Sequence, residues 1–583
     1  MTTLNFNNFY RKSVKWSCKR YLHCRGNDNS NNNYNNNINI KTNDSPIPFT
    51  YMKHYTSFYS LIAFLLCLIS VQLFSQDILW EKSIGGKHAD YLFDAVPTAD
   101  YGFLLAGSSL SGKTGKKTDA NQGDLDYWLW KMNEHGDLEW QKSFGGTGSD
   151  FLQRVELTND GGFILVGTSN SPKGEGKKED SRGQEDIWVI KLDAKGAEEW
   201  QKTIGGSSQE MVHSVRQTVD GGYIIGASSA SELSGDKESN SRGAMDYWII
   251  KLDKKGKIDW QQTYGGLYND FLKSIEPTHD GGYIVGGYSN SPESGDKNNR
   301  NFGIGDYWIL KLDKSGNLEW QQTLGGEKDD QLAILIQTRD GDFILGGNSN
   351  SGVSETKSKS NRTGTDFWVI KLNKEGEEIW QETYHFGKSD ILTSIVENED
   401  KTLLIAGFAK SEVNGTKKSD REEINDYAFI KIKEDGEEIF KRTVGSNGEE
   451  IMRKVIITRD GGYLLTGTSS GEPSRDKKSA VGSQDFWVVK LKDKDKRKED
   501  KLAIEAFPNP TAQYTNVIIG YDYEKGTCSV FDLAGRQLQN FDIAKERTIP
   551  VDLGGLPEGI YVIEIKTNVQ KDGVKVIKGI RRN

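Results

Sequence analysis

Short apolar runs of strand length, separated by polar turns, fill most of the chain and come in groups of four. In residues 199–252 the runs are EWQKTI, MVHSVRQT, GGYIIGAS and DYWIIKL. VDGG between the second and third runs, and DKKG after the fourth, are typical of tight hairpin turns. GGSSQE joins the first run to the second, and only SELSGDKESNSRGAM, before the fourth run, is long. The pattern predicts a four-stranded antiparallel sheet.

This group of runs recurs at intervals of 60 residues. The repeat is marked by a Trp column at Trp80, Trp140, Trp200, Trp260, Trp320 and Trp380, which Phe440 continues, and by an Asp column at Asp100, Asp160, Asp220, Asp280, Asp340, Asp400 and Asp460. Seven copies cover about residues 77–492. Seven four-stranded units predict an all-β fold, a seven-bladed β-propeller. A linear solenoid is the alternative, although it needs distinct capping repeats.

The repeat line DGGYIIGASS…DYWIIKLDKKGKIDWQQTYGG resembles the repeat of bacterial β-propeller families. The resemblance extends over all seven copies and implies the propeller fold. It says little about activity, because one fold carries many functions.

The order of turns suggests how the blades are divided. We expect the long connection to cross from blade to blade, so that the DYW run is the innermost strand. Asp485–Leu491 would then enter the first blade as its inner strand and close the ring with C-terminal chain. The DYW run leads away from the long connections, so the chain should leave the ring on the opposite face.

The first 76 residues differ from the repeats. Residues 1–51 are basic and contain the polar tract NDNSNNNYNNNINIKTN. This suggests that Met52 is the true start of the protein and that residues 1–51 are a mis-called upstream extension. A disordered leader is the alternative. Residues 52–76 have a short basic start, an apolar stretch from Leu61 to Val71, and Ser75 before Gln76. This is the pattern of a secretory signal peptide. The apolar stretch is short for a transmembrane helix, so we expect no transmembrane span in the mature chain.

The net charge limits the classes of partner, and the cysteine content limits the disulfides. The formal net charge is −9, which argues against nucleic acid or an anionic lipid surface as a partner. After the signal peptide the chain keeps one cysteine, Cys528, so an internal disulfide is excluded.

The aromatic columns favour packing over ligand binding. Trp also recurs in the DYW run, at Trp128, Trp188, Trp248, Trp308, Trp368 and Trp487. A residue present in every blade serves what every blade must do, which is to pack against its neighbour. The Asp that opens each DYW run is interpreted as a cap on the long connection. Its alternative is a ring of carboxylates at the mouth of the central channel.

The first copy alone contains DANQGDLD. Asp119, Asn121, Asp124 and Asp126 could supply oxygen ligands to Ca²⁺. The spacing matches no known calcium loop and the other copies lack it. We predict no other cofactor, and Ca²⁺ stays a hypothesis for these four residues.

Signs of catalysis are weak. The seven His occupy unrelated positions in the blades, and the chain contains no G-x-S-x-G, H-E-x-x-H or phosphate-loop motif. The sixth copy departs most from the repeat, because HFGKSD (His385–Asp390) replaces the usual Gly-Gly turn. Drift of one blade explains this, and so does a specific function for that blade. We predict a binding protein more readily than an enzyme.

A charged linker at residues 493–502 precedes a different pattern at 503–583. The motifs AFPNPT, VFDLAGR, LPEGIYVIEI and VKVIKG predict a small β-sandwich. Together, in this order, they closely resemble the C-terminal sorting domain of the type IX secretion system, with a plain adhesive sandwich as the alternative. The residues that match the family motifs are Pro508, Asn509, Pro510, Asp532, Gly535, Arg536, Gly559, Tyr561, Lys575 and Lys578. The resemblance implies the type IX machinery as a partner, and release from the cell or display on its outer surface.

These features suggest an exported propeller scaffold that binds protein or polysaccharide ligands through its long loops, since variable loops on a rigid scaffold often carry recognition. An extracellular hydrolase or lyase with its site on the same face is the alternative. A structural component of the cell surface is a third hypothesis.

Overall fold

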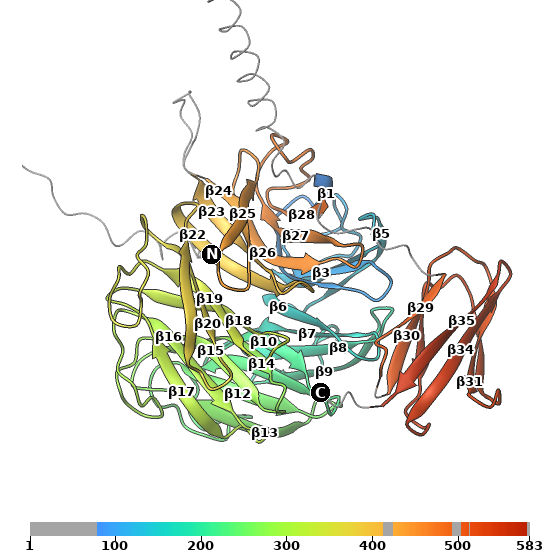
Figure 1. Ribbon diagram of the computed structural model, residues 1–583, viewed down its shortest axis with the longest axis horizontal. Coiled ribbons are helices and arrows are strands. Elements are labelled where there is room, and N and C mark those ends of the chain that lie inside the picture. The colour runs from blue at the N-terminus through green and yellow to red at the C-terminus, as the bar shows by residue number, and fades with distance from the viewer. Residues whose placement is uncertain (1–77, 412–423, 493–502, 512, 580–583) are drawn as a thin grey trace, which may run out of the picture. The chain divides into compact units, whose positions relative to one another are not determined.

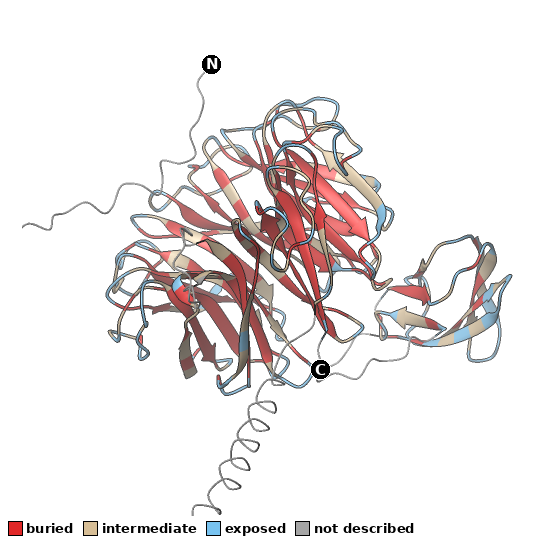
Figure 2. Cartoon of the chain, turned by 90° about the horizontal axis from the view of Figure 1, so that it is seen from above, coloured by how far each residue is buried: buried red, intermediate tan, exposed pale blue. Residues whose placement is uncertain are grey.

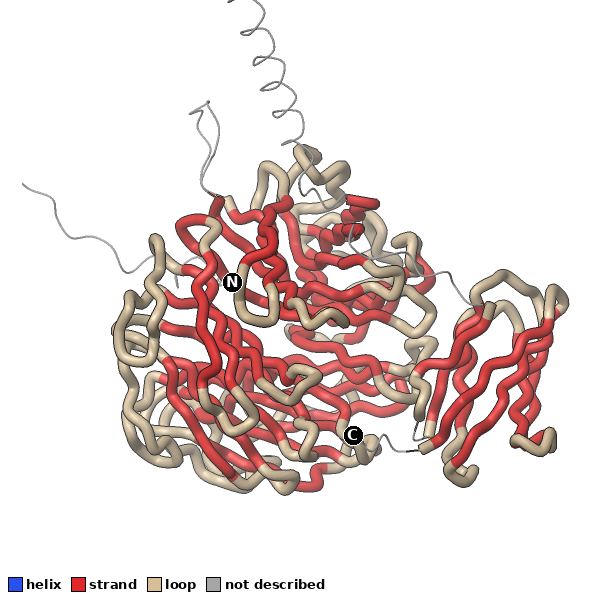
Figure 3. The backbone as a smooth tube through the Cα atoms, viewed as in Figure 1, coloured by secondary structure: helices blue, strands red, loops and turns tan. Residues whose placement is uncertain are grey.

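The computed structural model describes residues 78–411, 424–492, 503–511 and 513–579. Every regular element in these ranges is a β-strand (Figure 3). In the part of the chain described here, no helix has the length and apolar character needed to cross a membrane. The extension predicted at 1–51, the signal peptide predicted at 52–76 and the linker predicted at 493–502 lie outside the described residues.

Seven four-stranded antiparallel sheets follow one another in chain order (Figure 1). Their strands are β2–β5 (Asp90–Pro97, Phe103–Ser109, Asp126–Met132, Leu138–Phe144), β6–β9 (Asp150–Leu157, Phe163–Ser169, Asp186–Leu192, Glu198–Ile204), β10–β13 (Glu210–Gln217, Tyr223–Ser229, Asp246–Leu252, Ile258–Tyr264), β14–β17 (Asp270–Pro277, Tyr283–Ser289, Asp306–Leu312, Leu318–Leu324), β18–β21 (Asp330–Gln337, Phe343–Ser349, Asp366–Leu372, Glu378–Tyr384), β22–β25 (Gly387–Glu397, Leu403–Ser411, Asn425–Ile432, Glu438–Val444), and β26–β28 (Glu450–Ile457, Gly462–Ser469, Asp485–Lys492) with β1 (Ile78–Ile84). The predicted seven-bladed β-propeller is confirmed, and we number the blades one to seven in this order.

The innermost strand of each blade is its first strand, not the DYW strand. The first strands, β2, β6, β10, β14, β18, β22 and β26, contact one another around the ring. The predicted strand order was therefore wrong. The long connection joins two neighbouring strands of one blade, such as β11 and β12, which pair from Tyr223–Leu252 to Ser229–Asp246.

The chain crosses between blades at the short Gly-Gly link instead. Gly205–Gln209 lead from the outermost strand β9 to the innermost strand β10 of the next blade. A four-stranded sheet is about 14 Å across, and five extended residues can reach that far. The length of a connection was thus a poor guide to which connection changes blades.

The N-terminal strand β1 closes the ring, so the prediction that Asp485–Leu491 closes it by entering the first blade was wrong. β1 pairs antiparallel with β28, from Ile84 opposite Phe486 to Ile78 opposite Leu491. It forms the outer strand of the seventh blade, whose order is β1-β28-β27-β26. Asp485–Lys492 is therefore the third strand of the last blade and does not enter the first. The predicted exit face is confirmed, because β28 ends beside the start of β1, opposite the long connections.

Packing between neighbouring sheets forms the core of the propeller. Seven buried clusters each combine residues of two adjacent blades. One of them joins Tyr247 and Ile249 of blade three to Leu272, Trp308 and Leu310 of blade four. The second and third strands of the blades are accordingly buried over nearly all of their length, whereas the outer strands are only partly buried (Figure 2). Each blade is held by the side chains of its neighbours, as a closed ring requires.

The C-terminal residues form a separate β-sandwich, as predicted. One sheet contains β29 (Ile504–Phe507), β30 (Tyr514–Ile519) and β33 (Thr548–Asp552) in the order β29-β30-β33. The other contains β31 (Gly526–Asp532), β32 (Gln537–Ile543), β34 (Gly559–Thr567) and β35 (Lys571–Lys578) in the order β32-β31-β34-β35. Val517 and Val551 of the first sheet pack with Val530 and Ile563 of the second. Cys528 is buried in this core, and burial raises its thiol pKa to about 12.

Candidate functional site

In six blades the Asp that opens the third strand caps the long connection, as predicted; most of the long connection of blade six lies outside the described residues. Oδ2 of Asp246 accepts hydrogen bonds from the backbone N–H of Arg242 at 2.5 Å and from the Ser241 hydroxyl at 2.8 Å. The equivalent backbone bonds are Gln122 to Asp126, Arg182 to Asp186, Phe302 to Asp306, Arg362 to Asp366 and Val481 to Asp485. Because the third strand is not innermost, these carboxylates do not form the alternative ring at the channel mouth.

The four residues of the Ca²⁺ hypothesis lie in and just after the long connection of blade one. The Nζ atom of Lys117 donates to Oδ1 of Asn121 at 2.8 Å and to the carbonyl oxygen of Asp119 at 3.0 Å. Asp119 also accepts from the backbone N–H of Ser143 at 3.2 Å. The carbonyl oxygen of Asp124 accepts from the side chain of Asn121, and Asp126 is the cap already described. A lysine ammonium thus takes up oxygens that Ca²⁺ would use, and the hypothesis stays a prediction.

That lysine belongs to a column in the long connections. Lys117, Lys177, Lys237, Lys297, Lys357 and Lys477 are each at most 2% exposed. Lys297 lies near Asp306 and Asp270, yet burial outweighs both carboxylates and lowers its pKa to about 8. The six connections that the structure describes are each further held by an outer-strand side chain. Nε2 of Gln261 donates to the carbonyl of Asp236 at 2.7 Å, and its Oε1 accepts from the indole of Trp248 at 2.8 Å. These long connections are therefore held in place by side-chain hydrogen bonds.

A second carboxylate column opens the innermost strands, and sequence reasoning missed it. Its members, Asp90, Asp150, Glu210, Asp270, Asp330, Asp390 and Glu450, are fully buried. The 60-residue spacing was visible in the sequence. The structure adds that each lies next to the capping Asp of the preceding blade, as Gly305 and Asp329, the residues before Asp306 and Asp330, form a parallel bridge. Seven junctions between blades therefore each contain two buried carboxyl groups.

The outer-strand tryptophans pack between blades. The ring of Trp260 lies edge-on to Tyr283 of the next blade, with ring centroids 5.8 Å apart. Its other neighbour is Gly316, where an added Cβ would approach the indole to 2.6 Å. Trp140, Trp200 and Trp320 have the same type of contact with Gly196, Gly256 and Gly376. The Trp residues of the third strands are fully buried. The packing interpretation of both columns is confirmed.

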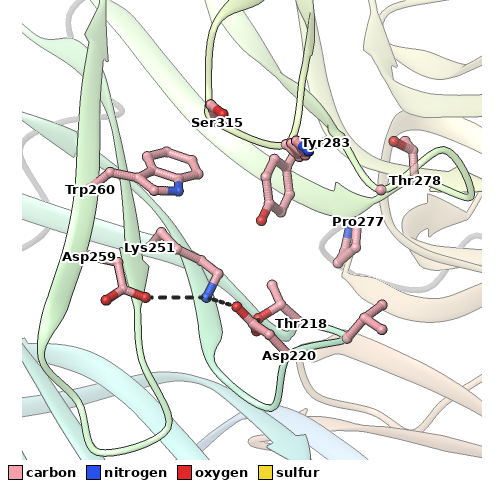
Figure 4. A pocket seen from close by; sticks show the side chains of 12 residues that line it. Thr218, Asp220, Lys251, Asp259, Trp260, Pro277, Thr278, Tyr283 and Ser315 are labelled. Atoms are coloured by element: carbon pink, nitrogen blue, oxygen red, sulfur yellow. Dashed lines mark hydrogen bonds and ion pairs between the residues drawn. The ribbon is translucent and has the colours of Figure 1, made fainter.

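One face of the ring carries the VDGG and DKKG turns and lies opposite the long connections; we call it the hairpin face. A pocket of about 460 Å³ opens beside Trp260 on this face (Figure 4). Nζ of Lys251 lies in it between the carboxylates of Asp220, at 2.8 Å, and Asp259, at 3.8 Å. Asp220 also accepts from Thr218 and from the backbone N–H of Gly222, so its charge is well satisfied. With its ions paired and its indole packed against Gly316 and Tyr283, this pocket is better explained as a gap between blades than as a ligand site.

The inner strands enclose a second cavity, of about 310 Å³. Its charged residues are also paired. The guanidinium of Arg216 donates to both carboxylate oxygens of Glu276, at 2.5 to 2.9 Å, and to Glu156 at 3.4 Å. The arrangement joins the inner strands of blades two, three and four, which are neighbours around the ring.

Several apolar side chains are exposed on the opposite, long-loop face. Leu233 (63% exposed), Leu267 (54%), Tyr268 (53%) and Ile304 (70%) belong to the loops of blades three and four and to the link between these blades. Val353 (65%) lies in the long connection of blade five. The backbone of Leu267 and Tyr268 bonds the long loops of both blades. The N–H of Leu267 donates to the Ser294 hydroxyl of blade four, and the Tyr268 carbonyl accepts from the N–H of Ala244 in blade three. The other blade-to-blade links have no such apolar pair, so this region breaks the repeat.

The sixth blade differs where the sequence indicated. His385 stands at the position that is Gly in the other six links. Its Nδ1 lies 2.8 Å from Oδ1 of Asp366 and 3.8 Å from Oδ2 of Asp390. Asp366 is the capping Asp of blade five, and Asp390 opens the inner strand segment of blade six. His385 thus joins the carboxylate pair at this junction.

The motif residues of the sandwich support its fold. Asn509, between Pro508 and Pro510, binds β35 through the Lys575 carbonyl and the Ile577 N–H. Asp532 accepts from Arg536 in a turn where Gly535 has φ 78°. Gly559 begins β34, and the hydroxyl of Tyr561 in that strand donates to the Pro557 carbonyl at 2.6 Å. Lys578 is 9% exposed and donates to the Gly554 carbonyl at 3.1 Å. The side chain of Lys575 is exposed.

Comparison with known proteins identifies this domain. Residues 505–579 match the family model described as a secretion system C-terminal sorting domain. The chain is therefore a β-propeller protein that ends in a type IX secretion sorting domain, and it is exported by that route to the cell surface or the medium.

Other likenesses are partial. The regulatory protein FlaEY of Caulobacter vibrioides is 24% identical over 184 residues, which cover 30% of this chain and 19% of that protein. A fungal alcohol oxidase of the AA5 family in complex with copper has a TM-score of 0.42 at 10% identity, over 86% of this chain and 99% of that one. The Pan2 WD40 domain of Neurospora crassa has a TM-score of 0.34 at 11% identity, over 73% and 98%. Likenesses at these levels of identity and TM-score show nothing about the activity of this protein.

Proposed function

We propose that the protein is an exported scaffold that binds an extracellular protein through its long-loop face. The carrying observation is the exposed apolar pair Leu267 and Tyr268, with Leu233 and Ile304 exposed in the long loops of the same two blades. Large exposed apolar side chains grouped on one region of a soluble protein are typical of interaction sites. They lie where the repeat is broken, whereas the tryptophans that repeat in six of the seven blades are used in packing.

A protein ligand is favoured over a polysaccharide because three of these four side chains are aliphatic. Sugars are usually held by open aromatic faces, and the outer-strand indoles are packed between an aromatic ring and a glycine of the next blade and are only partly exposed. An exposed Tyr beside an aliphatic side chain is a common anchor in protein interfaces, where it becomes buried on binding. The rigid loops below, held by buried lysines and by outer-strand glutamines, would limit the entropy lost on binding.

The extracellular hydrolase or lyase is the second candidate. It needs His or carboxylate groups in an accessible pocket on this face. The His385 group is the feature that favours it, although its two carboxylates are fully buried.

The purified full chain is tested for retention on intact cells, on protease-treated cells and on insoluble polysaccharides. A variant carrying Leu267→Ser and Tyr268→Ser removes the apolar pair. Val219→Ser is the matched control, because Val219 is 86% exposed on the hairpin face. We expect retention on untreated cells that falls at least tenfold in the double variant, is unchanged in the control and is lost after protease treatment.

Retention on polysaccharide that survives protease treatment would replace the protein ligand by a glycan. Equal retention of the double variant and the wild type would reject the long-loop face. The absence of retention on every surface would reject the scaffold function and direct attention to substrate screens.

A further inference from the structure

The junction between blades five and six contains three side chains whose ligand atoms lie within 4.8 Å of one another: Asp366, His385 and Asp390. In the described part of the chain this is the one group of three His, Cys, Asp or Glu residues that meets that distance. Asp366 opens β20, Asp390 lies in β22, and His385 stands in the link between β21 and β22. Three segments from two blades therefore converge on one point.

Backbone groups already orient both carboxylates through one oxygen. Oδ2 of Asp366 accepts from the N–H of Arg362 at 2.8 Å. Oδ2 of Asp390 accepts from the N–H groups of Phe386, at 2.7 Å, and Gly387, at 3.2 Å. Oδ1 of Asp366 faces the imidazole at 2.8 Å, and Oδ2 is the Asp390 oxygen nearest to it, at 3.8 Å. Metal-binding carboxylates are commonly held in this manner by outer hydrogen bonds.

A second observation concerns the oxygen that remains on Asp390. Oδ1 of this fully buried carboxylate has no hydrogen-bond partner among the described residues. A buried carboxylate oxygen without a partner is costly unless a proton, a water or a cation meets it. Oδ1 of Asp150, Asp270 and Asp330 is unpartnered in the same way at three other junctions, so the imidazole is what sets this junction apart. The imidazole approaches both acids but bonds only Asp366, at 2.8 Å.

The surroundings exclude bulk water without closing the site completely. The ring of Phe386 packs on Phe367 with centroids 5.2 Å apart, and Nζ of Lys441 fixes the His385 carbonyl at 3.0 Å. The His385 side chain is 14% exposed, which leaves an approach from the long-loop face.

We propose that Asp366, His385 and Asp390 bind a divalent transition-metal ion, with Zn²⁺ as the best match. One imidazole nitrogen and two carboxylate oxygens are ligands that Zn²⁺ accepts, and three protein ligands leave a position for water. Ca²⁺ takes oxygen ligands and would not use the imidazole. The ion neutralises two buried negative charges and connects blade five to blade six. This proposal is independent of the proposed partner protein.

The same chain contains an internal comparison. The other six junctions have the carboxylate pair but Gly in place of His385, namely Gly85, Gly145, Gly205, Gly265, Gly325 and Gly445. His385→Gly therefore restores the residue found at every other junction, and we expect the variant to fold. His135→Gly is the matched control, because His135 is exposed on a hairpin turn of blade one.

The test uses the untagged full chain, stripped with chelator and dialysed against Zn²⁺ or Ca²⁺. Bound metal is measured by elemental analysis, and the unfolding temperature is recorded with and without metal. We expect one Zn²⁺ per chain for the wild type and for His135→Gly, with a rise of several degrees in unfolding temperature. Both effects should be lost in His385→Gly, and Ca²⁺ should produce neither through this site.

Zn²⁺ content that is equal in His385→Gly and the wild type would overturn the proposal. A wild-type chain that binds no Zn²⁺ would also overturn it, and His385 would then be only a counter-ion for the two acids. Asp390→Asn provides a second test, because the amide can still accept the backbone bonds while losing the charge. Its Zn²⁺ affinity should fall at least tenfold, and an unchanged affinity would contradict the assignment of Asp390 as a ligand.

Discussion

Gly316 lies directly against the indole ring of Trp260 in the preceding blade. A Cβ atom at position 316 would come within 2.6 Å of the ring, and the backbone there has φ +82°. The glycine of each DKKG-type hairpin thus has two roles, because it allows the left-handed turn and also leaves room for the neighbouring tryptophan. This contact explains why glycine and tryptophan recur together in the repeat.

Gly316→Ala should lower the free energy of unfolding by about 3 kcal/mol. About 1–2 kcal/mol comes from placing a side chain at positive φ, and the rest from the clash with Trp260. Gly281→Ala is the control, because Gly281 has φ +85° and open space around it. Urea unfolding of both variants should show a clearly larger loss for Gly316→Ala. Equal losses would mean that the hairpin moves away from the indole at no cost.

Tyr307→Phe should remove a hydrogen bond between blades. The buried Tyr307 hydroxyl donates to the Trp368 carbonyl of the next blade at 3.2 Å, and the two rings are 4.8 Å apart. We expect the free energy of unfolding to fall by about 1 kcal/mol, because ring packing is kept and only the bond is lost. Phe367 occupies the equivalent position in blade five, so the variant has a natural counterpart. A loss above about 3 kcal/mol in urea unfolding would mean that the ring packing changes as well.

The carboxyl pair of Asp306 and Asp330 should make stability depend on pH. Burial, together with the neighbouring Asp330, raises the pKa of Asp306 from 3.8 to about 7, against the opposing effect of backbone bonds and Lys297. A group with a raised pKa binds more protons in the folded than in the unfolded chain. Its contribution to the free energy of unfolding is therefore present at acidic pH and is lost as the pH rises from about 4 to about 7.

Asp306→Asn should remove this contribution, since asparagine does not titrate. We expect the fall in unfolding free energy between pH 5 and pH 8 to be smaller in the variant by about 2 kcal/mol. Asp313→Asn is the control, because hydrogen bonds from Asn317 lower the pKa of this exposed acid and place its titration below the window. Urea unfolding at the two pH values measures the difference. An identical fall in Asp306→Asn and the wild type would contradict the raised pKa.

Several features could be predicted from the sequence because they are local and repeated. The strand runs, the hairpin turns with their glycines and the packing columns of tryptophan each recur at the same offset in the copies. The capping role of Asp246 and its equivalents also follows from local chain geometry, and the motifs around Asn509 and Asp532 lie in short segments. Repetition of this kind reveals the unit of the fold even without a partner strand in view.

The sequence by itself determined that seven similar four-stranded units precede a sorting domain. Only the tertiary structure decided which strand is innermost, which link changes blades and which strand closes the ring, because connection length does not specify which sheet edges meet. It also brought Asp366 and Asp390 of two blades to one imidazole, and placed Leu267 and Tyr268 between two loops. Such groupings depend on how the blades pack against each other, and spacing along a single chain does not contain that information.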